Sequence, residues 1–274
     1  MLKLRVITAL VLVTIVLGAL FGLARDGFAI IAGIFFLAAG WEWSGMMGKL
    51  ALAWRLLWLL TLALLMVAVE SVRPDWLHWL ALWWLPALAL VVAYPKWATG
   101  WYKPWLLALV GWLLLVPSFE AVVAIKAEGA MGLAGPFALL FILVWVWAAD
   151  TGAYFSGRAF GKHKLAPAVS PGKTIEGLVG GVLLALAVTL LVLWLAPVAG
   201  AAWKLLLTAL VTVLASVLGD LFESMAKRQA GIKDSGKLLP GHGGMLDRID
   251  SITAALPVAA AMLTWLALPG GGLM

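Results

Sequence analysis

The sequence predicts an all-α polytopic membrane protein with about nine transmembrane helices. Of its 274 residues, 65% are hydrophobic and only 12% are charged, against about 45–50% and about 25% in soluble domains. A soluble domain of this length could not cover its surface with so few charges. Seventeen Trp residues fit a chain with many water–lipid boundaries, where amphipathic rings settle. A chain without Cys has no disulfides and no Cys-ligated metal centres.

Nine apolar runs are long enough to cross a bilayer, which takes roughly 20 residues. In chain order they lie at about 4–24, 28–47, 52–69, 76–94, 104–125, 134–157, 175–196, 202–223 and 249–268. A polar hinge near Lys49 and Arg55 separates the second run from the third. The first run resembles a signal peptide, because Lys3 and Arg5 precede it. It is long and lacks a small-residue cleavage site, so we interpret it as a span.

The runs divide the chain into two regions. Residues 1–125 form an N-terminal region of about five helices. Residues 126–274 form a C-terminal region of about four helices, with the polar loops 158–174 and 224–250. The sequence contains no repeat of fixed period and no low-complexity tract.

The distribution of Lys and Arg supports this count. Nine spans place the N-terminus and the loops near 48–55, 95–103, 158–174 and 224–248 on one side. That side receives fifteen of the 19 Lys and Arg residues, and the other side receives Arg25, Arg73, Lys126 and Lys204. Such a bias marks the cytoplasmic side. We therefore expect an integral protein of a bacterial-type inner (plasma) membrane, with its site on the cytoplasmic side. The net charge of +6 follows from this bias, so we expect no nucleic-acid partner.

The most polar segment is "KDSGKLLPGHGGMLDRID", residues 233–250. Just before it, polar side chains at i, i+3, i+4, i+7 and i+8 spacing share one helix face: Asp220, Glu223, Ser224, Lys227 and Arg228. Asp247 and Asp250 share a face at the start of the last run. The glycines of "PGHGG" allow backbone N–H groups to face an anion, and a helix N-terminus follows them.

Carboxylates and cations together indicate a particular kind of site. Carboxylates alone would indicate a proton or cation path, and cations alone would indicate binding of anionic head groups. Both together fit a phosphorylated ligand whose charge Mg²⁺ bridges to the protein. Any one of these residues could instead complement a helix N-terminus or set the topology. Asp220 follows a long apolar run, where ionisable residues are usually functional, and the joint arrangement favours a site for nucleotide chemistry.

A second polar cluster runs from residue 147 to residue 177. Asp150 ends its apolar run much as Asp220 ends another. The "GKT" at 172–174 is not a P-loop, because Pro167 stands where that motif needs Gly and no soluble α/β unit surrounds it. We interpret Ser170-Pro171 as a turn into the next span, with Lys173 placed to meet phosphate.

Two further predictions concern the same cluster. Gly177 and Gly181 lie four residues apart in an apolar run, a spacing typical of a close helix-packing face. We interpret His163 as an exposed loop residue.

The C-terminal polar residues form a pattern that resembles the signature of a known family. The pattern is Ser224-Met-Ala-Lys227-Arg228, Lys233-Asp234, Pro240-Gly241-His242-Gly243-Gly244 and Asp247-Arg248-x-Asp250. It resembles the phosphatidate cytidylyltransferases, or CDP-diacylglycerol synthases. "DTGAYFSGRAFGKHK" and "SPGKTIEG" resemble that family too, so the similarity extends from about Phe141 to the end of the last run. The five N-terminal runs match only in hydropathy.

The resemblance implies transfer of CMP from CTP to phosphatidic acid, with CDP-diacylglycerol and pyrophosphate as products. It implies Mg²⁺ held by Asp220 and Asp247, with Asp250 as a further candidate and a second cation left open. The catalytic candidates are Asp220, Asp247, Lys227 and Arg228. The substrate-binding candidates are Lys173, Ser224, Lys233, Asp234, Gly241, His242, Gly243, Gly244 and Arg248. The expected partners are CTP, phosphatidic acid and membrane lipid, with a homodimer left open.

Two other functions share some of these features. A CTP-dependent polyprenol or phytol kinase would also consume CTP, but it would release CDP. A transporter would place charged residues at mid-span and often carry paired repeats. The clustering of polar residues at one end of the predicted spans favours the cytidylyltransferase.

Overall fold

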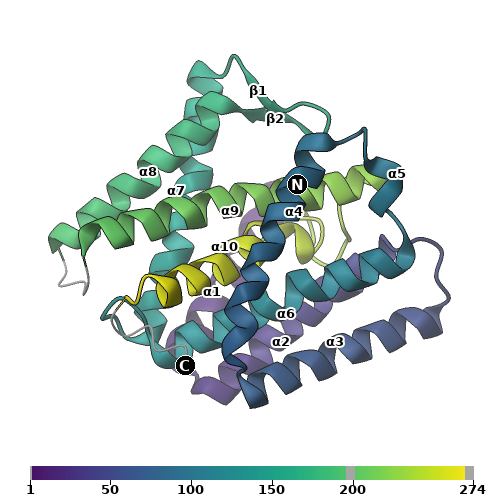
Figure 1. Cartoon of the computed structure of the whole chain (residues 1–274), viewed down its shortest axis with the longest axis horizontal. Helices are drawn as coiled ribbons and strands as arrows, with labels where there is room; N and C mark the ends of the chain where they lie inside the picture. The colour runs from purple at the N-terminus through teal and green to yellow at the C-terminus, as the bar shows by residue number, and fades with distance from the viewer. Residues whose placement is uncertain (1, 196–200, 269–274) are drawn as a thin grey trace.

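The computed structural model describes residues 2–195 and 201–268, except for the side chains of residues 2–5, 75 and 99. It is predominantly helical (Figure 1). The elements are α1 (Leu2–Gly22), α2 (Arg25–Gly45), α3 (Leu52–Val72), the 3₁₀ helix η1 (Asp75–Trp83), α4 (Trp84–Ala93), α5 (Ala98–Trp101), α6 (Pro104–Glu128), α7 (Gly135–Phe160), β1 (Lys164–Ala166), β2 (Ser170–Thr174), α8 (Ile175–Leu195), α9 (Ala202–Gln229) and α10 (Leu246–Trp265). Residues 1, 196–200 and 269–274 of the predicted spans and regions lie outside the described residues.

Every predicted apolar run coincides with a helix, the fourth with η1 and α4 together. Seven described helices are long and apolar enough to cross a membrane: α2, α3, η1–α4, α6, α7, α8 and α9. A shorter apolar stretch, Val6–Gly22, forms most of α1. The structure therefore confirms the prediction of an all-α, polytopic integral membrane protein.

The α10 helix differs from these spans because protein surrounds it. It contacts α2, α6, α7, α9 and η1, and residues 253–263 are all buried. The Ser118 hydroxyl of α6 donates a hydrogen bond to the Thr253 carbonyl at 2.7 Å. The many alanines of α10 let the neighbouring helices approach closely. A helix in this position does not need the long apolar side chains that face lipid.

Glycines hold α7 and α8 together, as the spacing of Gly177 and Gly181 predicted. A Cβ atom at Gly181 would lie 2.5 Å from the Ala149 carbonyl oxygen, and one at Gly152 would lie 2.6 Å from the Gly180 carbonyl oxygen. The two backbones therefore touch along this contact. This close packing places the hairpin after α7 beside α9.

The segment 164–174 forms a β-hairpin, where the sequence predicted a loop and a turn at Ser170-Pro171. Lys164 pairs with Thr174 and Ala166 with Ser170, and the Val169 amide closes the turn onto the Ala166 carbonyl at 3.1 Å. Pro171 is tolerated because each strand of a two-stranded ribbon has a free edge. The prediction was wrong here because a short strand of mixed polarity has no alternation to reveal it.

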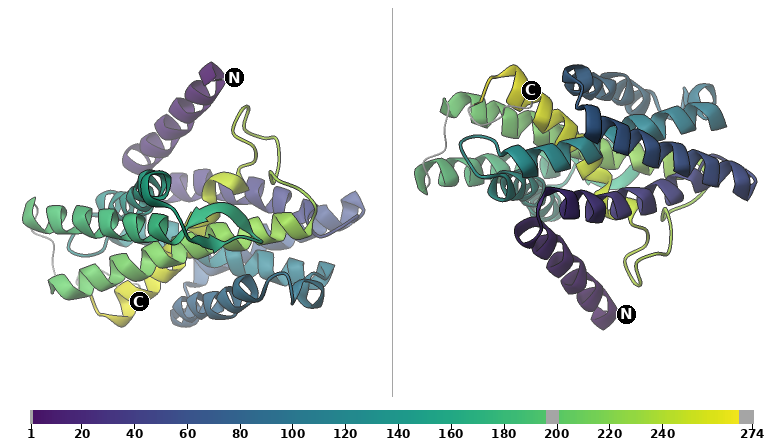
Figure 2. Two further views of the ribbon diagram at one scale, coloured as in Figure 1. Left: turned by 90° about the horizontal axis from the view of Figure 1, so that it is seen from above. Right: turned by 90° about the horizontal axis from the view of Figure 1, so that it is seen from below.

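One end of the bundle carries the N-terminus and the four predicted polar loops. The contacts that gather them there are Thr8 Oγ1 to the Pro240 carbonyl oxygen at 3.0 Å, the Tyr102 hydroxyl to the Met46 carbonyl oxygen at 2.6 Å, Ser235 Oγ to Glu42 Oε2 at 3.1 Å, and Lys173 Nζ to Asp220 Oδ2 at 2.7 Å. Figure 2 shows α1 leaning away from the other helices on the side where the segment between α9 and α10 projects. The predicted loops therefore do share an end.

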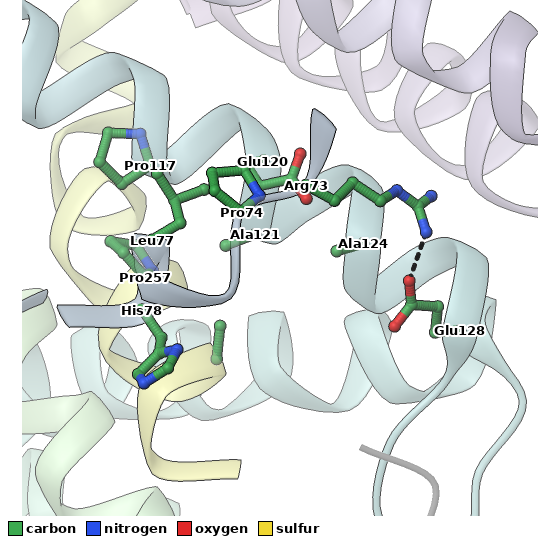
Figure 3. Close-up of a pocket in the computed structure, with 11 residues that line it drawn as sticks. Arg73, Pro74, Leu77, His78, Pro117, Glu120, Ala121, Ala124, Glu128 and Pro257 are labelled. Carbon is green, nitrogen blue, oxygen red and sulfur yellow. Dashed lines mark hydrogen bonds and ion pairs between the residues drawn. The ribbon is translucent and has the colours of Figure 1, made fainter. Parts of the chain in front are cut away.

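The opposite end holds the four remaining cations, and each has a partner. Arg25 pairs with Glu70, Arg73 with Glu128 at 2.6 Å (Figure 3), Lys126 with the Leu23 carbonyl oxygen at 2.6 Å, and Lys204 with the Leu266 carbonyl oxygen at 2.7 Å. The division of charge read from the sequence is thus a division between the two ends of the bundle.

Candidate active site

The last turns of α9 supply one wall of the candidate site. Asp220, Glu223, Ser224 and Lys227 face α10 and the hairpin, as their helical spacing predicted. Arg228 does not join them. Its side chain is exposed and donates a hydrogen bond to the Ile232 carbonyl oxygen at 3.3 Å. It lies at the rim, where the chain leaves the helix.

The hairpin brings Lys173 onto Asp220. The Lys173 ammonium lies 2.7 Å from Asp220 Oδ2, and the Ser224 hydroxyl lies 3.2 Å from Asp220 Oδ1. Thr174, the last residue of β2, accepts a hydrogen bond from the Gly177 amide at 3.1 Å and so caps the start of α8. The hairpin is therefore fixed to α8 through Thr174 and to α9 through the preceding residue, Lys173.

Lys227 joins α9 to the start of α10. Its ammonium lies 2.7 Å from Asp247 Oδ1 and 3.2 Å from Glu223 Oε1. Asp247 Oδ2 also accepts hydrogen bonds from the Gly244 amide at 2.8 Å and the Ser235 amide at 3.0 Å. Asp247 precedes the apolar part of α10. Burial alone would raise the pKa of its carboxyl, but the hydrogen bonds from Lys227 and the backbone amides outweigh burial and lower the pKa.

Carboxyl groups outnumber ammonium groups in this cluster. The Asp250 carboxyl is close to that of Glu223. The negative charge of Asp220 is close enough to act on the carboxyls of both Asp250 and Asp150. The carboxyls are those of Asp150, Asp220, Glu223, Asp247 and Asp250, and the ammonium groups are those of Lys173 and Lys227. The excess of oxygen ligands suits a cation with hard-ligand preference. We call these seven residues the charged row.

A polar cavity lies in the glycine-rich loop that precedes Asp247. Its volume is about 630 Å³, and its lining includes Asp234, Lys237, Gly241, His242, Gly243 and Arg248. Gly241 and Gly243 have positive φ angles of 78° and 84°, a conformation that glycine adopts without strain. The imidazole Nδ1 of His242 is buried and has no hydrogen-bond partner. Most of the predicted substrate-binding residues therefore surround one cavity.

Two predicted loop residues occupy other positions. The Gly244 amide already donates to Asp247, so it supports the loop and does not face the cavity as an anion-binding group. Lys233 is exposed outside the cavity lining. The sequence pattern placed both residues in the same loop as His242, but it could not distinguish inward from outward positions.

A second cavity lies between α7, α8, α9 and the hairpin. Its volume is about 430 Å³. Its charged side chains are those of Asp150, Arg158 and Lys173. Tyr154 and Val217 also line it. Lys173 belongs both to this cavity and to the ion pair with Asp220. Two members of the charged row, Asp150 and Lys173, thus line this second cavity.

Sequence reasoning missed Glu42 and Ser235. Glu42, in the last turn of α2, accepts hydrogen bonds from the Ser235 hydroxyl at 3.1 Å and the Leu246 amide at 2.8 Å. The available signal was an acidic residue inside an otherwise apolar run, which is usually functional. Asp150 carried the same signal, and the structure places it in the charged row.

Comparison with known proteins identifies relatives over nearly the whole chain. Residues 3–266 match the model of the cytidylyltransferase family. The chain is similar to the phosphatidate cytidylyltransferase of Pseudomonas aeruginosa, with 46% identity over 268 residues, 96% of this chain and 97% of that protein. It is 41% identical over 283 residues to the phosphatidate cytidylyltransferase of Haemophilus influenzae, which covers 94% of this chain and 96% of that protein.

A third relative matches over a shorter stretch. The phosphatidate cytidylyltransferase of Staphylococcus saprophyticus is 48% identical over 125 residues, 46% of this chain and 48% of that protein. Because one family model covers nearly the whole chain and two relatives align over nearly their full length, the chain belongs to the cytidylyltransferase family.

Proposed function

We propose that the protein transfers CMP from CTP to phosphatidic acid, giving CDP-diacylglycerol and pyrophosphate. The observation that carries this proposal is the charged row, with one cavity that it lines and a second in the adjoining glycine-rich loop, at one end of a membrane bundle. A lipid substrate must keep its phosphate at the membrane boundary while its acyl chains stay in the bilayer. The names of the relatives agree with these substrates.

The two cavities suit the two substrates. The polar cavity of the glycine-rich loop would hold the CTP phosphates, with His242 donating a hydrogen bond and Arg248 and Lys237 supplying charge. The cavity beside Tyr154 and Val217 would admit the phosphatidate head from the lipid, with Arg158 and Lys173 on its phosphate. The two phosphates would then meet at the charged row.

In the reaction, a phosphatidate oxygen bonds to the α-phosphorus of CTP. The bond from that phosphorus to its bridging oxygen breaks, and the electron pair leaves with pyrophosphate. The phosphate monoester is mostly dianionic at neutral pH, since its second pKa is about 6, so no strong base is required. The main barrier is the approach of two polyanions. Lys173 and Lys227 reduce it by neutralising charge and fixing both groups in place.

Mg²⁺ fits the residues present. Carboxyls outnumber ammonium groups in the charged row, and Mg²⁺ prefers oxygen ligands, commonly one or two carboxylates plus substrate phosphates. Within residues 2–195 and 201–268, no three His, Cys, Asp or Glu side chains form a metal cluster on their own. Asp220 and Asp247 would hold the ion together with the substrate, and Asp250 would contribute charge. When bound, Mg²⁺ would offset the negative charge of the phosphates.

We also place the active site on the cytoplasmic side. The site end carries fifteen of the 19 Lys and Arg residues of the chain, and such a bias marks the cytoplasmic face of inner-membrane proteins. CTP is then available to the site directly from the cytoplasm.

Product analysis tests this function. Purified protein is incubated with CTP labelled on the α-phosphorus, Mg²⁺ and phosphatidic acid in detergent micelles. We expect label in the lipid fraction as CDP-diacylglycerol, with one pyrophosphate released for each lipid formed. In a parallel incubation with polyprenol or phytol in place of phosphatidic acid, release of CDP and transfer of the unlabelled γ-phosphate to that alcohol would identify a lipid kinase instead. Absence of both products would contradict nucleotidyl transfer.

A further inference from the structure

Glu42 is a buried acid that reaches the site from the N-terminal region. Glu42 is 5% exposed. Its Oε2 accepts hydrogen bonds from the Ser235 hydroxyl at 3.1 Å and from the Leu246 amide at 2.8 Å, across 193 and 204 residues of sequence. Its Oε1 is buried and has no hydrogen-bond partner. Among the residues that the structure describes, no Lys, Arg or His forms an ion pair with it.

The loop before α10 is shaped around this carboxylate. A Cβ atom at Gly236 would lie 2.2 Å from Glu42 Oε1, and one at Gly244 would lie 2.4 Å from Glu42 Oε2. Neither glycine has a positive φ angle, so neither is needed for a left-handed turn. A side chain at either position would displace the Glu42 carboxylate, and one at Gly244 would displace the Ser235 hydroxyl as well.

Glu42 and Asp247 hold the loop from two sides. The Ser235 hydroxyl binds Glu42 while the Ser235 amide binds Asp247 at 3.0 Å. Gly244 donates its amide to Asp247, and the Leu246 amide two residues later donates to Glu42. The segment between Ser235 and Leu246 contains the His242 turn and most of the polar cavity lining. Each of the two carboxylates therefore holds both ends of that segment.

We propose that Glu42 is a positioning residue that holds the glycine-rich loop in the shape that binds CTP. A buried carboxylate without a cation is costly, so its position is explained only if the two hydrogen bonds it accepts serve a purpose. The N-terminal helices thereby contribute to a site whose other residues lie in the C-terminal region. This inference rests on the proposed function, because it assumes that the loop binds the nucleotide.

Replacement of Glu42 tests the proposal on the full-length protein. Glu42→Ala leaves Ser235 and Leu246 without their acceptor, so we expect the KM for CTP to rise tenfold or more. We expect kcat to change by less than threefold, because a loop that binds CTP equally in the ground and transition states affects KM alone. Glu42→Gln keeps an acceptor oxygen and should leave the KM for CTP within threefold of the wild type.

Glu120→Ala is the matched control. Glu120 is another buried acid of a membrane helix, 8% exposed, but it lies in the pocket at the opposite end of the bundle (Figure 3). Its replacement should leave the KM for CTP unchanged. If both variants raised this KM equally, or if Glu42→Ala only lowered the yield of active protein at constant KM, Glu42 would be structural and the proposal would be wrong.

The glycine contact gives an independent test. Gly236→Ala should raise the KM for CTP in the wild type, because the new methyl group displaces the Glu42 carboxylate. In the Glu42→Ala background the same change should add nothing, because all three nearest atoms are those of Glu42. Gly100→Ala is the control, since nothing lies within 4 Å of a Cβ there. Additive effects of Gly236→Ala and Glu42→Ala would overturn the proposal.

A readout without substrate completes the design. Amide hydrogen exchange in residues 235–246 should be faster in Glu42→Ala and unchanged in Glu120→Ala, and unchanged exchange in both would contradict the proposal. If Glu42→Ala does not fold, Gly236→Ala against Gly100→Ala decides the question. Failure of the proposed function is distinct, because the wild type itself would then form no CDP-diacylglycerol.

Discussion

Asp220 and Asp247 resemble each other in sequence, yet their surroundings give them different tasks. The Asp220 side chain is 28% exposed and meets the equally accessible Lys173, which is 27% exposed. The Asp247 side chain is 7% exposed and accepts hydrogen bonds from Lys227, Ser235 and Gly244. In the proposed function, Asp220 would exchange its partner when a substrate and a cation arrive. Asp247 is tied to the loop and to α9 before any substrate binds.

This difference predicts unequal effects of two similar replacements. Asp220→Asn should lower kcat at least a hundredfold, about 3 kcal/mol of transition-state stabilisation, with an unchanged melting temperature. Asp247→Asn should lower kcat as much and also lower the melting temperature, because buried partners lose their charged acceptor. Kinetics across a range of Mg²⁺ concentrations and thermal unfolding provide the measurements.

Asp26→Asn is the control for both variants. Asp26 is exposed in the first turn of α2, at the end away from the site, and its replacement should change neither kinetics nor stability. Near-normal turnover of Asp220→Asn at an unchanged Mg²⁺ requirement would remove Asp220 from the proposed metal site.

At the scale of elements, the contact between α7 and α8 places the hairpin. The two helices touch through glycines, and this contact fixes the base of the short hairpin that connects them. Thr174 caps α8 and leaves Lys173 one residue earlier, directed at Asp220. A change in the distance between α7 and α8 would therefore shift Lys173 relative to Asp220 in the charged row.

Gly181→Ala tests this coupling. The new Cβ would lie 2.5 Å from the Ala149 carbonyl oxygen, so the helices must separate, and overpacking of this kind costs about 1–3 kcal/mol. We expect a lower melting temperature, measured by Trp fluorescence of the detergent-solubilised protein, and a lower kcat. Gly18→Ala in α1, where nothing lies within 4 Å, should melt like the wild type. Equal melting of the two variants would show that α7 and α8 are not held by this contact.

At the scale of the whole molecule, the helices sort the charges between two ends. Contacts bring the N-terminus and the polar loops together at the site end. At the opposite end, Arg25, Arg73, Lys126 and Lys204 are each paired with a carboxylate or a carbonyl oxygen. The four cations at the opposite end thus serve local packing.

Cysteine labelling measures this topology directly, because the chain has no Cys of its own. Lys162 and Lys237 are exposed in the two site loops. Lys162→Cys and Lys237→Cys should both react with an impermeant maleimide only from the cytoplasmic side. Asp26→Cys should react only from the other side. Labelling of the two Lys positions from opposite sides would contradict both the span count and the shared site.

Most of the architecture and part of the site could be predicted from the residues alone. Apolar runs of about 20 residues become helices in a bilayer because their backbone groups must be satisfied internally. The face shared by Asp220, Glu223, Ser224 and Lys227 followed from the helical period, and the packing of Gly177 and Gly181 followed from their spacing. These features depend on neighbours close in sequence, so a local pattern reveals them.

The partners of these residues were decided only by the tertiary structure. The pairs Lys173–Asp220, Lys227–Asp247 and Glu42–Ser235 join segments that no periodicity connects. The same holds for the choice of amides: Gly244 serves Asp247, while His242 faces the cavity. Which charges meet depends on how α2, α9, α10 and the hairpin pack, and the packing of helices against one another is set by many distant contacts at once.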